Sequence, residues 1–549
     1  MSVSQQSAPI HADRRTYVCY DLRAIQTYIF RVPKLKYIVG GSALVDRFDR
    51  DFAANIARQF EDGVCQHVFS AGGKGTFDCR DAASANQVER CLCKEAHRLG
   101  LDIRFGRNSD FCEAAHSADK LYSFVPELVE GHPCEASGLY PVAPSQGQQN
   151  QLRGIHPTVQ KRVVDRGDPV FRHFENRLLS AKPDVGPGLA GRPICFLSNI
   201  EQSERDGRAG ACALEKKRWA VICMDGNDIG SQFRTAAKLP GGVPPSWIKN
   251  MSASLDKCAA AAGIKGIERV VRLWSEGMSN AEVDACVCDG EVVVPIRPLV
   301  VGGDDLVVLC HPAYAFDFIE AACAAWEAKS IEEAKQYGTR DGLTLWPATN
   351  GKLTISAGVL FCPVAMPIHT AVPYGESLLA SAKSGGRTKQ EPGACHPSPS
   401  MIDWETVVES ILDTPAARRA RELRFRDLDV PDGERGSIIE LTMRPYPLSQ
   451  FAELKAEAED PRNGLARIPR SVRGEMLASL RQGKSDRSLF RKRIAKNHQV
   501  LCDWLDETPG AARSKWKTTG EVGVLRTSLP DALSLLDEIS RHATEASDD

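Results

Sequence analysis

One pattern occurs twice in this chain and restricts its fold more than any other feature. Residues 17–30 (YVCYDLRAIQTYIF) and 219–233 (WAVICMDGNDIGSQF) both read as an apolar strand that ends in an aspartate before a helix or turn. Further along, each half has an apolar hairpin broken by two glycines, CQHVFSAGGKGTFDC at 65–79 and IRPLVVGGDDLVVLC at 296–310. A repeat on this scale indicates two copies of one supersecondary unit.

A helical pattern follows each hairpin, at residues 81–100 and 316–338, and another strand pattern follows each helix. The order in each half is the βαββαβ order of a ferredoxin-like palm. We therefore expect an α+β chain with two ferredoxin-like palm domains in tandem. The expected domains are 1–105 for a degenerate first palm, 106–215 for a linker or insertion domain, 216–398 for a second palm with the GGDD hairpin, and 399–549 for a helical C-terminal domain.

Composition excludes several classes of protein. With 42% hydrophobic and 26% charged residues among 549, the chain is in the ordinary globular range. No apolar run approaches the roughly 18 residues of a membrane span, and the N-terminus lacks the apolar core of a secretory signal. We expect a cytoplasmic protein whose eighteen cysteines are reduced. A net charge of −2 gives no global attraction to nucleic acid, so any such binding needs a local patch.

The hairpin of the second unit interrupts a buried-strand pattern with two charged residues, Asp304 and Asp305. In the βαββαβ order the first strand lies beside this hairpin, so Asp225 at the end of that strand should converge with them. Three carboxylates at one point repel strongly unless cations neutralise them. Two Mg²⁺ or Mn²⁺ ions held there would activate a ribose 3′-hydroxyl and stabilise charge at an α-phosphate. We predict these three aspartates as catalytic metal ligands; a solvated, Asp-rich turn is the alternative.

Glycines and small residues near this point fit nucleotide binding. Gly302 and Gly303 allow a sharp turn and the close approach of a triphosphate, which a Cβ would obstruct. The strand pattern LTISAGVLFC at 353–362 places Ser356 and its small neighbours where a base could approach. Asp228, in MDGNDIG, is also predicted to contact the nucleotide.

Lys383 lies near the end of a helical pattern at residues 374–389. Its flexible ammonium group is a suitable point charge for a triphosphate. The alternative is a solvated lysine that stabilises the helix dipole. Its position after the palm-like strand favours the phosphate interpretation.

The first unit differs from the second at its hairpin. Lys74 and Gly75 align with the two hairpin aspartates, so this hairpin should not hold two cations. Gly72 and Gly73 keep the close backbone approach. We expect the first palm to bind or orient a second nucleotide across the interface between the palms.

Several motifs together resemble one family. DLRAIQTYIFRVPKLKYIVGGSALVDRF, MDGNDIG, VGGDDL, ESLLASAK and LTMRPYPL, spread over residues 16–450, are similar to the large, polymerase-like subunit of type III CRISPR effector complexes (the Cas-ten or Cmr-two family). The resemblance implies that ATP is polymerised and cyclised into oligoadenylate messengers, with the metals on Asp225, Asp304 and Asp305. It also implies partners: other effector subunits, and guide and target RNA.

The sequence also departs from the family. Many members begin with a nuclease domain marked by a His-Asp pair; this chain has no His-Asp dipeptide, so no DNase activity of that kind is expected. Members often have a zinc-binding insertion after the first palm. CEASGLYPVAP (134–144) keeps one cysteine of it at most, and the pairs Cys91/Cys93 and Cys286/Cys288 lack matching ligand spacing, so we expect no zinc.

Two interpretations stay open in the basic stretch at 467–498 (RIPRSVRGEMLASLRQGKSDRSLFRKRIAKNH): a solvated helix face, or contact with an RNA backbone. The function also has alternatives. The chain is either a nucleotidyl cyclase, or a non-catalytic palm scaffold of a ribonucleoprotein complex, or a cyclic dinucleotide synthase that acts outside CRISPR. A scaffold needs no metal ligands, so the intact aspartates favour an enzyme.

Overall fold

The protein is described here from a computed structural model. The residues that it describes are 15–32, 35–120, 132–133, 141–142, 189, 192–196, 218–238, 243–276, 278–288, 290–387, 397–408, 413–431, 433–460, 465–495, 502, 504–507, 515–518, 521 and 523–539. Most of the predicted linker or insertion domain, including residues 134–140 of the candidate zinc segment, lies outside these residues.

The N-terminal unit is a four-stranded antiparallel sheet with helices. Its strand order is β2-β3-β1-β4, with β1 (Thr16–Arg23) in the interior, paired with both β3 and β4. The elements are β1, α1 (Ile25–Phe30), α2 (Leu35–Arg47), π-helix η1 (Phe48–Ala53), α3 (Ala54–Ile56), 3₁₀ helix η2 (Ala57–Gln59), β2 (Cys65–Ala71), β3 (Lys74–Cys79), α4 (Ala82–Leu99), β4 (Asp102–Asn108) and α5 (Phe111–Lys120).

Local sequence explains these element ends. Helix α4, predicted from the sequence at 81–100, begins with a capping box in which Asp81 and Ser84 exchange hydrogen bonds, and it ends at Gly100 in the left-handed region. Gly106 in β4 faces α5 so closely that a Cβ there would lie 1.8 Å from the Ala114 carbonyl oxygen. Glycine therefore allows α5 to pack directly on the sheet.

The central unit is a six-stranded sheet with the order β11-β12-β8-β15-β16-β19. Strands β11, β12, β8 and β15 pair antiparallel with one another, β16 is parallel to β15, and β19 is antiparallel to β16. The elements are β8 (Arg218–Gly226), α10 (Ile229–Ala236), α11 (Pro245–Glu276), β11 (Ile296–Gly302), β12 (Asp305–Cys310), η4 (Pro312–Tyr314), α13 (Ala315–Tyr337), β13 (Thr339–Arg340), β14 (Leu343–Thr344), β15 (Ile355–Pro363), α14 (Ile368–Arg387), β16 (Met401–Thr406) and β19 (Tyr446–Pro447). The predicted helices at 316–338 and 374–389 correspond to α13 and α14.

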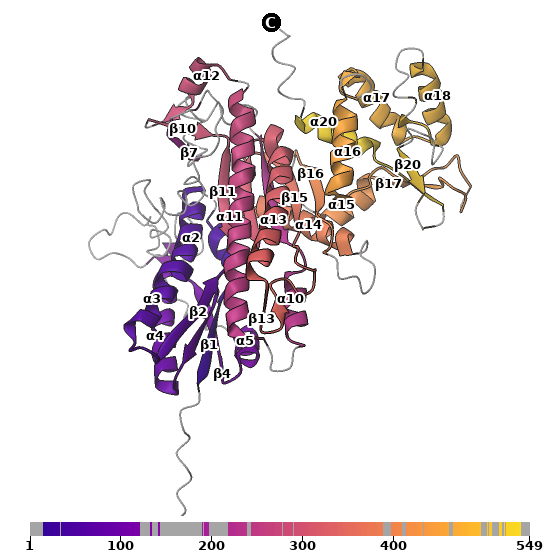
Figure 1. Cartoon of the computed structure of the whole chain (residues 1–549). Coiled ribbons are helices and arrows are strands. Elements are labelled where there is room, and N and C mark those ends of the chain that lie inside the picture. The colour runs from indigo at the N-terminus through magenta and orange to yellow at the C-terminus, as the bar shows by residue number, and fades with distance from the viewer. Residues whose placement is uncertain are drawn as a thin grey trace, which may run out of the picture.

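Both faces of the central sheet are buried, which explains the continuous apolar run of β8. Alternate residues of β8 belong to two different buried clusters. Ile222 packs in the cluster that contains residues of α11 and α13, whereas Val221 packs in the cluster that contains α14 and the core of the N-terminal unit. The two units therefore share a buried apolar interface, and Figure 1 shows the N-terminal unit beside the long helix α11.

Smaller sheets complete the described chain. They are formed by β7 (Ile194–Phe196), β9 (Val287–Cys288) and β10 (Glu291–Val294), next to α12 (Asn280–Ala285), and by β5 (His132–Pro133) with β6 (Pro141–Val142). No described helix combines the length and the apolar character that crossing a bilayer requires.

The C-terminal region is only partly helical, which corrects the prediction for 399–549. Its helices are α15 (Pro415–Glu422), α16 (Leu448–Glu459), η5 (Leu465–Arg467), α17 (Arg470–Leu480), α18 (Lys484–Ile494) and α20 (Leu529–Ile539). A four-stranded sheet accompanies them, with strands β17 (Arg424–Arg426), β18 (Ile438–Glu440), β20 (Trp516–Thr518) and β21 (Val524–Thr527). Strands of three or four residues are too short to show an alternating pattern in the sequence.

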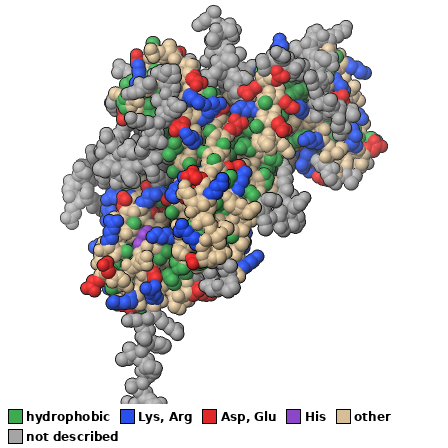
Figure 2. Space-filling view, in the orientation of Figure 1, with side chains coloured by type: hydrophobic (Ala, Val, Ile, Leu, Met, Phe, Trp, Pro, Cys, Tyr) green, Lys and Arg blue, Asp and Glu red, His purple; other side chains and the backbone are tan. Residues whose placement is uncertain are grey.

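Part of the basic stretch at 467–498 is engaged in ion pairs. Arg487 is buried and contacts Asp427 and Glu507, and Arg491 contacts Asp506. On the face shown in Figure 2, basic and acidic side chains are interspersed over the described surface. Binding of RNA by this stretch stays a prediction.

Candidate metal and nucleotide site

Three carboxylates converge at one edge of the central sheet. Asp225 at the end of β8 is the register partner of Asp305, the first residue of β12. The turn before β12 contains Asp304, whose carbonyl oxygen accepts a hydrogen bond from the Gly226 N–H at 3.2 Å. One carboxylate oxygen from each aspartate lies within 4.8 Å of the others. The structure therefore places together the three residues that the sequence predicted as metal ligands.

Electrostatics makes this cluster unfavourable without a cation. Burial, followed by the charge of Asp225, raises the pKa of Asp304 to about 7. Burial, followed by the charges of Asp304 and Asp225, raises the pKa of Asp305 well above its usual value. Lys383 opposes both shifts but does not cancel them. A divalent cation would supply the missing positive charge.

The donor set fits Mg²⁺ or Mn²⁺. Both ions prefer hard oxygen ligands, and Mg²⁺ binds them at about 2.1 Å, so opposite ligands lie about 4.2 Å apart. The spread of up to 4.8 Å between the carboxylate oxygens needs only a small closure to reach that geometry. Asp225, Asp304 and Asp305 are therefore suitable metal ligands.

Lys383 on α14 reaches this cluster, but in the structure it contacts the protein itself. Its Nζ donates to the Asp225 carboxylate and to the Gly226 carbonyl oxygen, the latter at 2.9 Å. Its predicted contact with a triphosphate would require it to leave Asp225, at least in part.

Ser356 and Asp228 have structural partners. The Ser356 side chain is fully buried; its hydroxyl donates to Asn227 Oδ1 at 3.0 Å and accepts from the Met401 N–H. Asp228 accepts hydrogen bonds from the N–H and hydroxyl of Ser398. Both residues line, with Lys383, a cavity of about 20 Å³. That volume holds about one water molecule and no base.

Gly358, one of the small residues predicted to let a base approach, has a different role. A Cβ at this position would lie 2.3 Å from the Leu379 nitrogen and 2.4 Å from the Gly375 oxygen, both in the backbone of α14. Gly358 is therefore needed so that α14, which carries Lys383, can pack against β15.

The two hairpins correspond in a register that differs by one residue from the prediction. Asp305 pairs with Asp225, and Lys74 pairs with Asp21. Lys74 therefore occupies the position of Asp305, and Gly73 occupies that of Asp304. The sequence had predicted that Lys74 would correspond to Asp304 and Gly75 to Asp305. The N-terminal turn is Gly72-Gly73, whereas the central turn is Gly303-Asp304, so alignment of the glycine pairs was misleading. The N-terminal hairpin still lacks both carboxylates.

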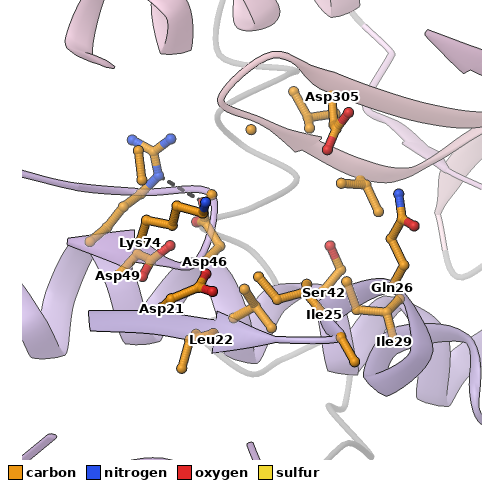
Figure 3. Close-up of a pocket in the computed structure, with 18 of the residues that line it drawn as sticks. Asp21, Leu22, Ile25, Gln26, Ile29, Ser42, Asp46, Asp49, Lys74 and Asp305 are labelled. Atoms are coloured by element: carbon orange, nitrogen blue, oxygen red, sulfur yellow. Dashed lines mark hydrogen bonds and ion pairs between the residues drawn. The ribbon is translucent and has the colours of Figure 1, made fainter. Parts of the chain in front are cut away.

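A cavity of about 330 Å³ lies between the two units. Figure 3 shows Asp305 of the central sheet across this space from Asp21 and Lys74 of the N-terminal sheet. Gly72 and Gly302, both predicted to contact nucleotides, also line it. Its described lining includes five aspartates but only two basic residues, Arg50 and Lys74. A triphosphate would need accompanying cations to enter so acidic a cavity.

Sequence reasoning missed two acids that hold the glycine turns. Asp49, which is 3% exposed, accepts hydrogen bonds from the Gly73 N–H at 2.6 Å and from the Tyr20 hydroxyl at 2.9 Å. Asp256 in α11 accepts a hydrogen bond from the Gly303 N–H at 3.1 Å. Each is an aspartate in a helical stretch, and the sequence alone does not distinguish such a residue from a solvated one.

Asp49 should make stability depend on pH. Burial raises its pKa from the model-peptide value of 3.8 to about 7, although the Gly73 N–H, the Tyr20 hydroxyl and Arg50 lower it and Asp46 raises it. The folded state therefore binds the proton more tightly than the unfolded state, and the free energy of unfolding falls as pH rises from about 4 to about 7.

Asp49→Asn removes the charge and can keep both contacts, with its amide oxygen accepting from the Gly73 N–H and its NH₂ group donating to the Tyr20 hydroxyl oxygen. Between pH 5 and pH 8 its stability relative to the wild type should improve by about 2–3 kcal/mol, measured by urea denaturation at both pH values. If the free energies of unfolding of the two proteins changed equally between pH 5 and pH 8, Asp49 would not have the raised pKa that this prediction requires.

One family model matches part of the chain. Residues 218–390 match the family model described as Cas10/Cmr2, second palm domain. No curated protein sequence matches the chain.

Solved structures give a weaker likeness. The chain is similar to Csm1 in T. onnurineus (15% identity, 91% of this chain and 65% of that chain, TM-score 0.45). It is also similar to a Csm1-Csm4 cassette in complex with pppApApA (14% identity, 96% and 70%, TM-score 0.47) and to one in complex with cA4 (15% identity, 90% and 64%, TM-score 0.42). The alignment thus spans less than two thirds of the cA4-bound chain.

The matched residues run from β8 through α14 and include Asp225, Asp304 and Asp305. Residues 218–390 of this chain are thus similar to the second palm domain of Cas10/Cmr2 proteins.

Proposed function

We propose that this chain is a metal-dependent nucleotidyltransferase that joins ATP molecules and closes the product into cyclic oligoadenylate, a signal in type III CRISPR-like antiviral defence. The observation that carries the proposal is the convergence of Asp225, Asp304 and Asp305, of which Asp305 lines a cavity that both units share. The match to the Cas10/Cmr2 second palm supports it.

The same proposal treats the chain as two palms in tandem. The strand order β2-β3-β1-β4 of the N-terminal sheet corresponds to β11-β12-β8-β15 of the central sheet. In both, the first strand of the unit lies between the hairpin and the last strand, as the βαββαβ order requires. The N-terminal unit is then a first palm without metal ligands, followed by a linker domain, the second palm and a C-terminal domain.

In each transfer, a 3′-hydroxyl oxygen bonds to the α-phosphorus of a second ATP, pyrophosphate leaves, and the hydroxyl proton passes to solvent. Asp225, Asp304 and Asp305 would hold two Mg²⁺ or Mn²⁺ ions, which would supply positive charge for polarising the hydroxyl and for neutralising the α-phosphate. Lys383 offers a further positive charge beside Asp225. Gly302 and Gly303 leave open space where a Cβ would point, so a phosphate can approach the backbone.

The N-terminal unit has the complementary task of holding the nucleotide that supplies the 3′-hydroxyl. Lys74 occupies the position equivalent to Asp305 and lines the same cavity, so it offers a positive charge where the second palm has a metal ligand. Gly72, where a Cβ would meet no atom within 4 Å, provides the close backbone approach, whereas a Cβ on Gly73 would lie 2.0 Å from the Ile25 side chain. Pre-orienting two reactants in this way lowers the barrier to their reaction.

Partners follow from the family. The similar structures include a Csm1-Csm4 cassette in complex with one ATP. For this chain we propose ATP as substrate, and other effector subunits with guide and target RNA as partners. Retention of all three carboxylates argues against a purely structural scaffold, which would tolerate their loss.

Incubation of the purified protein with each labelled NTP and Mg²⁺ or Mn²⁺, with and without guide and target RNA, tests the proposal. We expect cyclic and linear oligoadenylates from ATP only, identified by mass spectrometry, and no product after addition of EDTA. Conversion of GTP alone would replace this function by cyclic dinucleotide synthesis, and no product under any condition would favour the scaffold.

A further inference from the structure

Two consecutive residues of π-helix η1 reach the two glycine turns that face each other across the cavity. Asp49 accepts the hydrogen bond from the Gly73 N–H. Arg50 points the other way, and its Nη2 donates to Asp256 Oδ2 at 2.8 Å. The other carboxylate oxygen of Asp256 accepts a hydrogen bond from the Gly303 N–H. One short segment is therefore connected to both turns.

Neighbouring contacts and partial burial stabilise the ion pair between Arg50 and Asp256. Asp46, one helical turn before Arg50, accepts a hydrogen bond from its Nε at 2.7 Å and so fixes the direction of the guanidinium group. Asp256 is 18% exposed and Arg50 31% exposed, so solvent screens their ion pair less than it would a surface pair. The π-helix itself places Asp49 and Arg50 on different sides; such turns occur frequently at functional sites.

We propose that Asp49, Arg50 and Asp256, together called the turn clamp, act as positioning residues that set the spacing between the Gly72-Gly73 turn and the Gly303-Asp304 turn. The clamp thereby sets the separation of the two nucleotides. This inference rests on the proposed function, because it assigns one nucleotide to each turn. The three residues touch no metal ligand directly; Asp256 acts on Asp304 through the backbone of Gly303.

The clamp predicts a specific kinetic pattern. Arg50→Met breaks the connection between the units but leaves the three metal-binding carboxylates in place. The rate of joining two nucleotides should fall about 10- to 100-fold, because a displacement of about 1 Å between reactants has effects of that size. The affinity of the second palm for a single ATP analogue with Mn²⁺ should change less than about threefold, since positioning of a second reactant does not contribute to it.

Companion variants separate positioning from general stabilisation. Asp256→Asn keeps an oxygen acceptor for the Gly303 N–H but loses the ion pair, so it should resemble Arg50→Met. The double variant should be no slower than the slower single one, as expected for residues that act as a unit. Arg50→Lys should retain more of the wild-type rate than Arg50→Met does.

Arg47→Met is the matched control: this exposed arginine precedes Arg50 by three residues and lines a different cavity. Its rate should equal that of the wild type.

Hydrogen exchange measured by mass spectrometry gives a readout independent of catalysis. In Arg50→Met and Asp256→Asn, peptides covering residues 300–306 should exchange faster than in the wild type, on the order of tenfold. In Arg47→Met the exchange rates of these peptides should not change.

Failure of the wild type to convert ATP would overturn the proposed function, and the exchange data alone would then test whether the turn clamp exists. Unchanged exchange in both variants, or additive rate losses in the double variant, would overturn the clamp.

Discussion

Replacing both Asp304 and Asp305 with alanine should abolish nucleotide transfer while leaving the protein folded. These carboxylates would stabilise charge that develops only in the transition state, and loss of one such group already costs about 100- to 1,000-fold in rate. We therefore expect a loss of at least about 1,000-fold for the double variant. Burial and mutual repulsion raise the pKa of both groups, so their removal should leave the melting temperature unchanged or raise it.

The matched control is Asp284→Ala in α12, next to the small sheet of β7, β9 and β10, where the side chain is 64% exposed. Its rate should match that of the wild type. Product formation by the double variant within about tenfold of the wild type, with a normal thermal transition, would rule out these aspartates as the catalytic metal ligands.

Replacing Gly358 with alanine should have the largest effect on stability. The added methyl group would lie within 2.4 Å of two backbone atoms of α14, and a helix backbone cannot move aside as a flexible side chain can. We expect a loss of about 3 kcal/mol or more in the free energy of unfolding, the upper end of overpacking effects. Because α14 carries Lys383, a displaced helix should also lower activity.

Gly474 in α17 provides the opposite case. A Cβ there would meet no atom within 4 Å, so Gly474→Ala should stabilise the protein by about 0.5–1 kcal/mol through helix propensity. Urea denaturation of both variants measures the two effects. Equal stability of Gly358→Ala and the wild type would show that α14 does not pack against β15 as closely as described.

The convergence of Asp225 with Asp304 and Asp305 could be predicted because it depends only on the strand order of a repeated unit. Lengths and positions of α4 and α13 were also accessible, since long periodic segments leave a clear pattern, whereas α14 begins at Ile368, six residues before the predicted start. The register of the two hairpins was not, because the letters Gly-Gly occur in both but the turn falls one residue later in the second. Hydrogen bonding between strands decides such registers.

The supporting residues could not be found in the sequence for a different reason. Asp49, Arg50 and Asp256 come from helical segments some two hundred residues apart, and only tertiary packing brings them to the two turns. The sequence analysis predicted that Ser356 contacts a base because the residue is small. In the structure its hydroxyl instead donates a buried hydrogen bond to Asn227. Small residues in a strand mark a close approach, and the sequence alone does not say whether a ligand or a helix approaches.

The location of bound manganese tests the central claim most directly. Crystals of the wild type grown with Mn²⁺ and a non-hydrolysable ATP analogue give the position of each ion from its anomalous scattering. We predict manganese bound by the carboxylate oxygens of Asp225, Asp304 and Asp305, with Lys383 moved from Asp225 toward the triphosphate. Manganese bound elsewhere, or none at these carboxylates while Lys383 keeps its contact with Asp225, would contradict the account.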